Sequence, residues 1–274
     1  MKRNLSIVFI AVIAIFSNHI KAQSIYVNGG IGYGFPLAPM SFSVNYSSAS
    51  VQGVSGSCGK GFLPNLGVGY SFNEHVSAEI NINYLAGNKI EFSDTYSLGT
   101  PKELETLKAK MLRIIPAIKI TTGNSIKPYA RFGLVMGVFN RLYDDHTYYN
   151  PLWTGGYDTY HTFDVFKGNV AFGFSAAVGA DFTFSDKVSI YGELGTISQG
   201  WAPKKSVRTT YEINGEDRFA TLDQKDKEVD FVDSYNPNIA PVPTESTKSL
   251  KVHLPFSSWG INIGVHINIG SKKA

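Results

Sequence analysis

The stretch SSWGINIGVHINIG, residues 257–270, alternates between large apolar side chains and small or polar ones. From Trp259 to Ile269 every second residue is tryptophan, isoleucine or valine, and the residues between them are glycine, asparagine and one histidine. Successive side chains of a β-strand point to opposite faces, so this period of two predicts a strand. Glycine and asparagine are poor strand formers, and they are not the long polar side chains that normally face water. They suit the narrow lumen of a small closed barrel whose apolar face is turned to lipid.

Seven further segments show the same alternation. They are residues 24–35, 65–72, 76–83, 112–120, 129–139, 170–184 and 188–197. Short turns follow the second, fourth and sixth segments, whereas long connections follow the first, third, fifth and seventh, at residues 36–60, 87–107, 140–167 and 200–250. Outer-membrane barrels have an even number of strands, short periplasmic turns and long external loops. The sequence therefore predicts an all-β protein, an eight-stranded antiparallel up-and-down transmembrane β-barrel with long external loops and both termini in the periplasm.

The first 22 residues have the features of a secretory signal peptide. Lys2 and Arg3 precede an apolar stretch over residues 5–16, and Ala22 is a small residue at the expected cleavage position. We therefore expect a signal peptide at 1–22 and one barrel domain at 23–274. The signal contains three of the 25 basic residues and none of the 22 acidic ones, which leaves 22 of each in the remainder. A balanced charge gives no support to nucleic-acid binding.

Two further absences in the sequence narrow the choice of fold. Cys58 is the only cysteine, so no disulfide can form within the chain. No stretch after the signal approaches 18 consecutive apolar residues, which argues against helical membrane spans. A membrane protein with this sequence is therefore expected to cross the membrane with strands.

Aromatic residues are sorted toward the two ends of the predicted strands. Seven of them point outward: Tyr33, Phe35, Tyr84 and Trp259 near the long loops, and Phe72, Phe182 and Phe184 near the tight turns. Two aromatic bands separated by aliphatic residues are typical of the interfacial girdles of a transmembrane barrel. We therefore expect outer-membrane lipid to surround these residues.

Most inward positions carry glycine, alanine, serine or asparagine, with six charged exceptions. These are Glu79, Arg113, Lys119, Arg131, Asp181 and Glu193. Isolated charges in a narrow lumen carry a large desolvation cost, so three acids and three bases are expected to pair. Eight strands leave an interior just wide enough for side chains. We therefore predict a structural salt-bridge network that plugs the lumen, in preference to a path for ions or protons.

At this point the chain resembles a known group of proteins. The segments IYVNGGIGYGF, PYARFGL (128–134), FGFSAAVGADFTF and YGELG (191–195) make it similar to the eight-stranded outer-membrane barrels grouped with the OmpA transmembrane domain, OmpX and the opacity-type proteins. The resemblance covers residues 24–270 and implies a location in the bacterial outer membrane. The chain departs from that pattern at NIGSKKA, where such barrels usually end on an aromatic residue.

Candidate catalytic and metal-binding residues are few. The segment YDDHTYY (143–149) brings Asp144, Asp145 and His146 together, but three adjacent residues on a loop do not define a catalytic geometry. His266 and Ser189 are expected in the lumen near the periplasmic end. The acidic segment DQKDKEVDFVD (223–233) lacks the spacing of a calcium loop. We therefore predict no catalytic residue, no cofactor and no metal site.

The long loops are the segments that remain to carry the function. Within the last of them, Asn214-Gly215 predicts a hairpin, and a shift in the apolar phase predicts a bulge near Ser257–Ser258. The expected function is non-catalytic: surface interaction or adhesion, or a structural role in the envelope, with protein or glycan ligands bound by the segments 36–60, 87–107, 140–167 and 200–250. The alternatives are a small porin-like channel, an outer-membrane enzyme acting at the loop rim, and a soluble lipocalin-like ligand-binding barrel.

Overall fold

The computed structural model describes residues 24–37, 39–46, 51–95, 101–153, 155–185 and 187–269. The predicted signal peptide, residues 1–22, lies outside the described residues. The described chain consists mainly of β-strands, with one short 3-10 turn, η1 (Phe219–Thr221), and one short helix, α2 (Gln224–Lys227). No helix in these ranges is both long and apolar enough to cross a membrane.

Eight antiparallel strands pair in a closed ring. They are β1 (Ser24–Pro36), β5 (Asn65–Ser71), β6 (Val76–Thr95), β7 (Pro101–Thr121), β8 (Ile126–Pro151), β10 (Ala171–Thr183), β11 (Val188–Trp201) and β17 (Ser258–Asn268). Each strand pairs with the next in this order, and β17 pairs with β1 to close the ring. They correspond to the eight alternating segments of the sequence, so the predicted all-β, eight-stranded antiparallel arrangement is confirmed.

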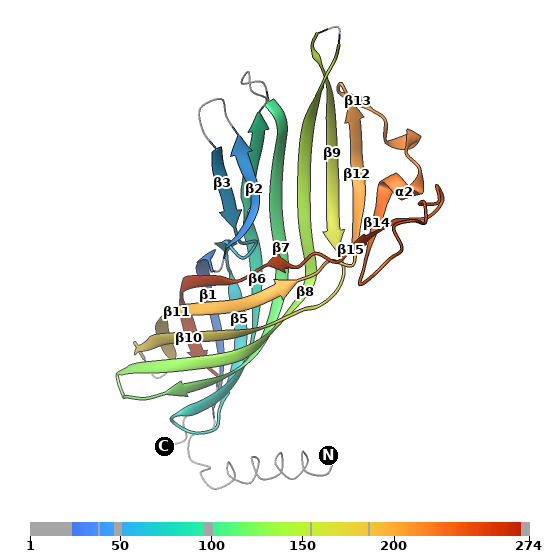
Figure 1. The fold of residues 1–274 in the computed structure, drawn as a ribbon. Helices are drawn as coiled ribbons and strands as arrows, with labels where there is room; N and C mark the ends of the chain where they lie inside the picture. The colour runs from blue at the N-terminus through green and yellow to red at the C-terminus, as the bar shows by residue number, and fades with distance from the viewer. Residues whose placement is uncertain are drawn as a thin grey trace, which may run out of the picture.

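The three short connections lie together at one end of the ring, beside the ends of β1 and β17 (Figure 1). The Asn73 side chain stabilises the first of them by accepting hydrogen bonds from the backbone N–H groups of His75 and Val76, both at 2.8 Å. In the second, Gly123 has a φ of 87°, a conformation that L side chains rarely adopt. We call this end of the ring the turn end and the opposite end the loop end.

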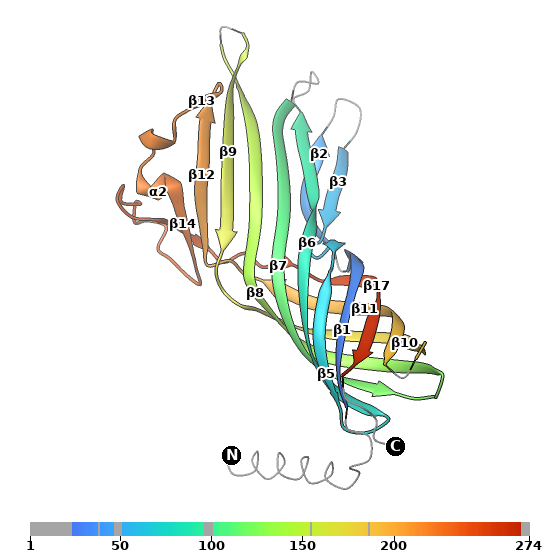
Figure 2. The same cartoon turned by 180° about the vertical axis from the view of Figure 1, so that it is seen from behind.

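Several strands continue far beyond the ring at the loop end (Figures 1 and 2). The upper parts of β6, β7 and β8 pair in sequence and are followed by β9 (Tyr157–Lys167), β12 (Lys205–Ile213), β14 (Glu228–Val232) and β15 (Thr247–Leu250). We call this the extended sheet. Strand β8 has 26 residues, which span about 85 Å at 3.3 Å per residue, whereas about 9–11 residues cross a membrane. Much of the chain predicted as long loops is therefore regular sheet.

Four further short strands lie at the loop end. Strands β2 (Met40–Tyr46) and β3 (Val51–Gly56) form a separate antiparallel hairpin. Strand β4 (Gly61–Phe62) pairs with β1 and β6, and β16 (Leu254–Pro255) pairs with β11.

Two bulges change which residues face inward at the base of the extended sheet. Between the Leu112–Val138 and Lys110–Arg141 pairs, β8 contains one more residue than β7, and Phe139 there has a φ of 51°. Strand β6 has a similar extra residue between Ala86 and Lys89. An extra residue moves every later side chain of the strand to the opposite face. Within the ring, the odd-numbered residues of β6 and β8 therefore face the lumen. Above the ring, in the extended sheet, the even-numbered residues of these two strands face the lumen side.

The two local predictions for the last long connection have different outcomes. Asn214 and Gly215 have φ values of 53° and 79° and form the turn between β12 and β13 (Glu216–Asp217), so the hairpin is confirmed. The bulge predicted at Ser257–Ser258 is wrong. The pairs Ile197–Ser258 and Gly200–Pro255 keep the same register, so no residue is inserted.

The outer surface of the ring is apolar. Val178, Leu194 and Ile263 are 58%, 52% and 56% exposed, and they represent a continuous belt of isoleucine, valine, leucine and phenylalanine. Contiguous apolar surface of this extent is unfavourable in water. It matches the lipid-facing band of a transmembrane barrel.

Candidate functional site

The lumen contains a charge bridge close to the turn end. Arg131 on β8 donates to Glu79 on β6 at 3.2 Å and to Glu193 on β11 at 2.5 Å, and the two carboxylate side chains are 0% and 5% exposed. Tyr26 donates to Glu79 at 2.6 Å and Tyr129 donates to Glu193 at 3.0 Å. One guanidinium therefore links two strands on opposite sides of the ring, and two tyrosine hydroxyls complete the hydrogen bonding of the acids.

A second ion pair lies in the same region of the lumen. The Lys119 ammonium is 2.7 Å from Asp181 and 4.0 Å from the centroid of the Tyr129 ring. The other oxygen of Asp181 is 2.9 Å from Nδ1 of His266, which faces the lumen as the sequence predicts. Five of the six charged lumen residues are therefore brought together, with Lys119 bound to Asp181 and Arg131 bound to both glutamates.

Arg113, the sixth, is not paired with an acid. Its Nε donates to Gln199 at 2.9 Å and its Nη2 donates to the carbonyl oxygen of Phe256 at 3.0 Å. The side chain is fully buried, and its Nη1 has no hydrogen-bond partner among the described residues. Arg113 is thus held by neutral groups at the level where the lumen becomes apolar.

A cluster of apolar side chains, which we call the apolar cap, fills the loop end of the lumen. Its members are Cys58, Leu85, Phe92, Leu107, Ala109, Met111, Leu142, Ala171, Trp201, Leu254 and Phe256. They come from β6, β7, β8, β10, β11 and β16 and from the connections after β3 and after β16. The Trp201 indole packs edge-on against Phe256 and donates to the Gly168 carbonyl at 2.8 Å. Leu254 and Phe256 are apolar because they belong to this cap.

Between the charge bridge and the apolar cap lies a cavity of about 80 Å³. Its lining includes Asn65, Asn81, Asn83, Asn262 and Arg131. Side-chain oxygens of Asn81 and Asn83 are buried without a protein partner, and a polar cavity of this volume has room for a few water molecules. The lumen thus contains a short polar compartment, with charged side chains below it and apolar side chains above it.

The glycines of the inward faces are required by this packing. A Cβ added to Gly67 would lie 2.0 Å from Oδ1 of Asn81, and one added to Gly69 would lie 2.1 Å from Cζ of Tyr26. Either contact is far shorter than real Cβ atoms show. Glycine faces the lumen because large side chains from the opposite wall occupy the space.

The seven outward aromatic residues lie in two bands. At the loop end, Phe35 stacks on Trp259 with centroids 4.6 Å apart, Tyr33 contacts Phe35, and Tyr84 is 39% exposed. At the turn end lie Phe72, Phe182 and Phe184, of which Phe182 and Phe184 are 45% and 71% exposed.

The lumen-side face of the extended sheet carries a polar cluster above the apolar cap. Asp144 and His146 point to this face, together with Glu103 and Glu105 of β7. Asp145 points to the opposite face, where its carboxylate contacts His161 at 2.9 Å. Asp144, Asp145 and His146 therefore do not form one site, although they are consecutive in the sequence.

Crowded carboxylates perturb the acids of this cluster. Desolvation, together with the nearby Asp144 and Glu103 carboxylates, raises the pKa of Glu105 to about 8. Desolvation and the Asp164 carboxylate raise the pKa of Asp144 to about 7. The sequence does not single out Glu103 and Glu105, because the segment 87–107 lacks the apolar alternation of a membrane strand and is predicted to be a loop. The available signal was the spacing of two glutamates at i and i+2, which places both on one face of a strand.

A family model agrees with this architecture. The family model for the outer membrane protein beta-barrel domain matches residues 8–214. A search of curated proteins found no match. Solved structures that match the chain include the outer membrane protein OprG from Pseudomonas aeruginosa, at 10% identity and TM-score 0.41, covering 92% of this chain and 98% of that one. Another is AlkL in lipid bilayers, at 9% identity and TM-score 0.39, covering 94% and 95%. A third is outer membrane protein W of E. coli, at 8% identity and TM-score 0.35, covering 92% and 100%. With the family model matching more than half of its length, this chain belongs to the outer membrane beta-barrel family.

Proposed function

We propose that this protein is a non-catalytic surface-interaction protein of the bacterial outer membrane, in which a plugged barrel anchors a sheet that binds partners outside the cell. The observation that carries the proposal is the length of β6, β7 and β8, which have 20, 21 and 26 residues where about 9–11 cross a membrane. A pore needs no sheet of this height, whereas a protein that makes contacts beyond the membrane surface does.

The polarity of the two ends supports an outward orientation of the extended sheet. Barrels of this family type have short turns on the periplasmic side and long segments outside. The turn end holds three short connections and the meeting point of the first and last strands, Tyr26 and Asn268. This arrangement favours periplasmic termini and an external loop end.

The contents of the lumen favour an anchor over a channel. The charge bridge and the apolar cap lie on either side of a cavity of about 80 Å³, and each crosses the ring. Ions would have to displace paired charges and then an apolar layer, both of which oppose conduction.

The tip of the β8–β9 hairpin has the composition of a contact surface. Trp153 is 106% exposed, Leu152 is 40% exposed and Tyr157 is 42% exposed, and all three lie at the end of the extended sheet that is farthest from the ring. Tryptophan and tyrosine are enriched at the centres of protein interfaces. Below them, Tyr148 and Tyr160 stack with centroids 4.6 Å apart. We propose that this aromatic tip makes the first contact with a partner.

The proposal is tested by the adhesion of cells to immobilised mucin and immobilised fibronectin. Cells carrying the wild type are compared with cells carrying a Trp153→Ser, Leu152→Ser variant, with membrane levels of both proteins matched. We expect the variant to lose most of the adhesion that the wild type confers. A control variant with Asn73–His75 replaced by another short turn should adhere like the wild type. If the wild type confers no adhesion to either surface, or the tip variant adheres equally well, the aromatic tip is not the contact site.

Orientation is tested separately by adding protease to intact cells. Cleavage should fall within residues 200–250 and spare the turn at Asn73–His75. Cleavage confined to the three short turns would show that the turn end, and not the extended sheet, lies outside the cell.

A further inference from the structure

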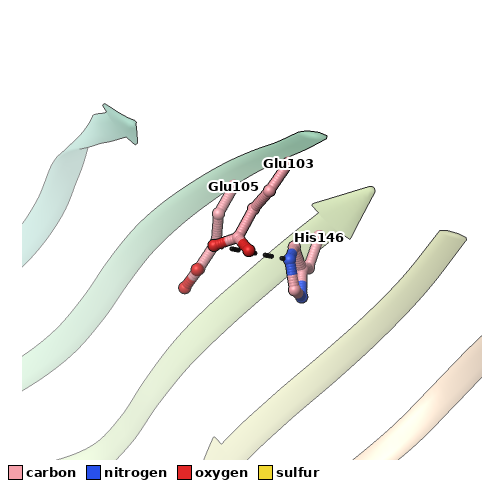
Figure 3. A group of neighbouring side chains, drawn as sticks. All are labelled: Glu103, Glu105 and His146. Carbon is pink, nitrogen blue, oxygen red and sulfur yellow. Dashed lines mark ion pairs between the residues drawn. The ribbon is translucent and has the colours of Figure 1, made fainter. Parts of the chain in front are cut away.

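Three side chains with metal-ligating atoms converge on the lumen-side face of the extended sheet (Figure 3). Glu103 and Glu105 are two residues apart on β7 and point to the same face, and His146 of β8 is the direct pairing partner of Glu105. One ligand atom from each lies within 4.8 Å of the others, and all three side chains are half-buried. His146 reaches this face only because the bulge at Phe139 shifts the phase of β8 by one residue.

The protein itself leaves these groups without adequate partners. Nε2 of His146 is buried and has no hydrogen-bond partner, and its nearest acidic oxygen, on Glu103, is 3.9 Å away. Asp144, two residues before His146 on the same face, shares a hydrogen bond with Glu105 and has a second buried oxygen without a partner. Two glutamates and an imidazole therefore converge on one point, and Asp144 binds one of these glutamates from the side.

Nearby basic residues do not pair with these acids. The Arg208 guanidinium, which acts on Asp144 electrostatically, binds Asp164 through two hydrogen bonds of 3.0 Å each. Among the described residues, no lysine or arginine lies within ion-pair distance of Glu103, Glu105 or Asp144. Like charges in a half-buried position destabilise one another unless a cation lies between them.

We propose that His146, Glu105 and Glu103 bind a divalent transition-metal ion of the zinc class, with Asp144 positioned to supply a further oxygen. One imidazole nitrogen with two or three carboxylate oxygens is a donor set that suits zinc, nickel or copper, whereas calcium prefers six to eight oxygens. Zinc holds its nitrogen and oxygen ligands at about 2.0–2.2 Å, so any two lie roughly 4 Å apart or less. Side-chain rotations that move ligand atoms by about 1 Å are enough to close the site.

The position of this site suggests what the ion does. It would link β7 to β8 above the apolar cap, where the two strands have left the ring. A metal there would hold the upper parts of β7 and β8 together and would concentrate the ion outside the membrane. The inference is independent of the proposed surface interaction, since none of these residues belongs to the aromatic tip.

The experiment is a calorimetric titration of the full-length protein, folded in detergent micelles and stripped with a chelator, using zinc chloride as the probe. We expect saturable binding of one equivalent. His146→Gln and Glu105→Gln should each weaken binding by roughly tenfold or more, given the tenfold to hundredfold losses seen when even the supporting partners of ligands are removed. Cobalt in place of zinc should give visible absorption bands in the wild type, and His146→Gln should abolish them.

His161→Gln is the matched control. His161 lies on the neighbouring strand and also contacts two acids, but its Nε2 faces Asp145 at 2.9 Å and its Nδ1 faces Glu212 at 3.2 Å. The two acids contact opposite nitrogens of the imidazole, so they cannot bind one ion together with His161. This variant should bind zinc like the wild type. Heat-dependent migration on gels checks the folding of each variant, and Glu103→Gln, at a half-exposed position, replaces any variant that fails to fold. Absence of saturable zinc binding in the wild type would refute the site, as would equal binding by His146→Gln.

Discussion

Replacing Arg131 by methionine removes the cation that links two buried acids across the lumen. Arg131 donates to Glu79 at 3.2 Å and to Glu193 at 2.5 Å, and the side chains of these acids are 0% and 5% exposed. Methionine fills a similar volume without charge. The variant therefore isolates the electrostatic role of the guanidinium from its packing.

The expected loss of stability depends on which hydrogen-bond partners each acid keeps. Removing one partner of a buried ion pair destabilises a protein by about 3–5 kcal/mol, because an uncompensated charge stays behind. Here two acids lose their partner, but Tyr26 still donates to Glu79 and Tyr129 still donates to Glu193. We expect Arg131→Met to lower the free energy of unfolding by about 4 kcal/mol, within that range. Adding Glu79→Gln and Glu193→Gln removes both orphaned charges and should recover most of the loss.

The assay is reversible urea unfolding in lipid vesicles, followed by the fluorescence of the native tryptophans. The coupling between Arg131→Met and Glu193→Gln should be at least about 1 kcal/mol, since residues in direct contact are not additive. Arg113→Met is the control, because Arg113 has only neutral partners. The variant leaves one carbonyl and one amide oxygen unpaired, at about 1–3 kcal/mol each. It also removes a buried charge that has no acidic partner, which offsets part of this loss, so the net cost should be smaller than that of Arg131→Met. Additive losses for Arg131 and Glu193, or an equal cost at Arg113, would refute the charge bridge.

Four other predictions concern the lipid face, the lumen and the extended sheet. Val178 is 58% exposed on the outer belt, so Val178→Arg should destabilise by about 2–4 kcal/mol in the same unfolding assay. In contrast, Gly179→Leu should reduce the folded yield by crowding, since a Cβ there lies 2.6 Å from the Tyr129 ring. The full-length protein in planar bilayers should show no steady conductance, and large stable currents would identify a channel instead. Burial lowers the pKa of His161, but hydrogen bonds to its two flanking acids outweigh this and raise the pKa above its ordinary value. The stabilisation that protonated His161 gives to the folded state is therefore complete below about pH 6 and is lost as pH rises through the raised pKa. These interactions stabilise the protein by less than about 1 kcal/mol, because the His161 side chain is one-third exposed. The urea midpoint of the wild type should therefore fall slightly as pH rises through the His161 pKa, and the midpoint of His161→Gln should not show this fall.

The alternation of apolar and small residues along the sequence is sufficient to predict the ring of eight strands. Lipid on one side and a crowded lumen on the other impose opposite demands on successive residues, so each membrane strand shows its two faces directly. Val178 and Gly179 illustrate this, since one faces lipid and the next meets Tyr129. The alternation of short and long connections then predicts the number of strands, and it predicts that the first strand begins and the last strand ends at the same end of the ring. Inward charges could be recognised by their position in the same pattern.

Which of those charges meet was decided only by the closed ring. Arg131 and Glu79 lie on strands that are not neighbours, and their contact depends on the stagger of the strands around the lumen. The same stagger sends Lys119 to Asp181 and leaves Arg113 with neutral partners. No spacing along the chain contains this information.

The extended sheet was hidden for a different reason. Above the membrane both faces of a strand meet water or polar neighbours, so the apolar period disappears, and residues 87–107 and 140–167 look like loops. Two bulges then reverse the phase, which brings His146 to the face of Glu105 although simple alternation continued from Arg131 would put it on the other. The order of the amino acids is therefore enough to predict a membrane barrel with one elaborate end. The pairing of β7 with β8 decided what that end is and which side chains it brings together, because the hydrogen bonds that set a register join residues about 40 positions apart.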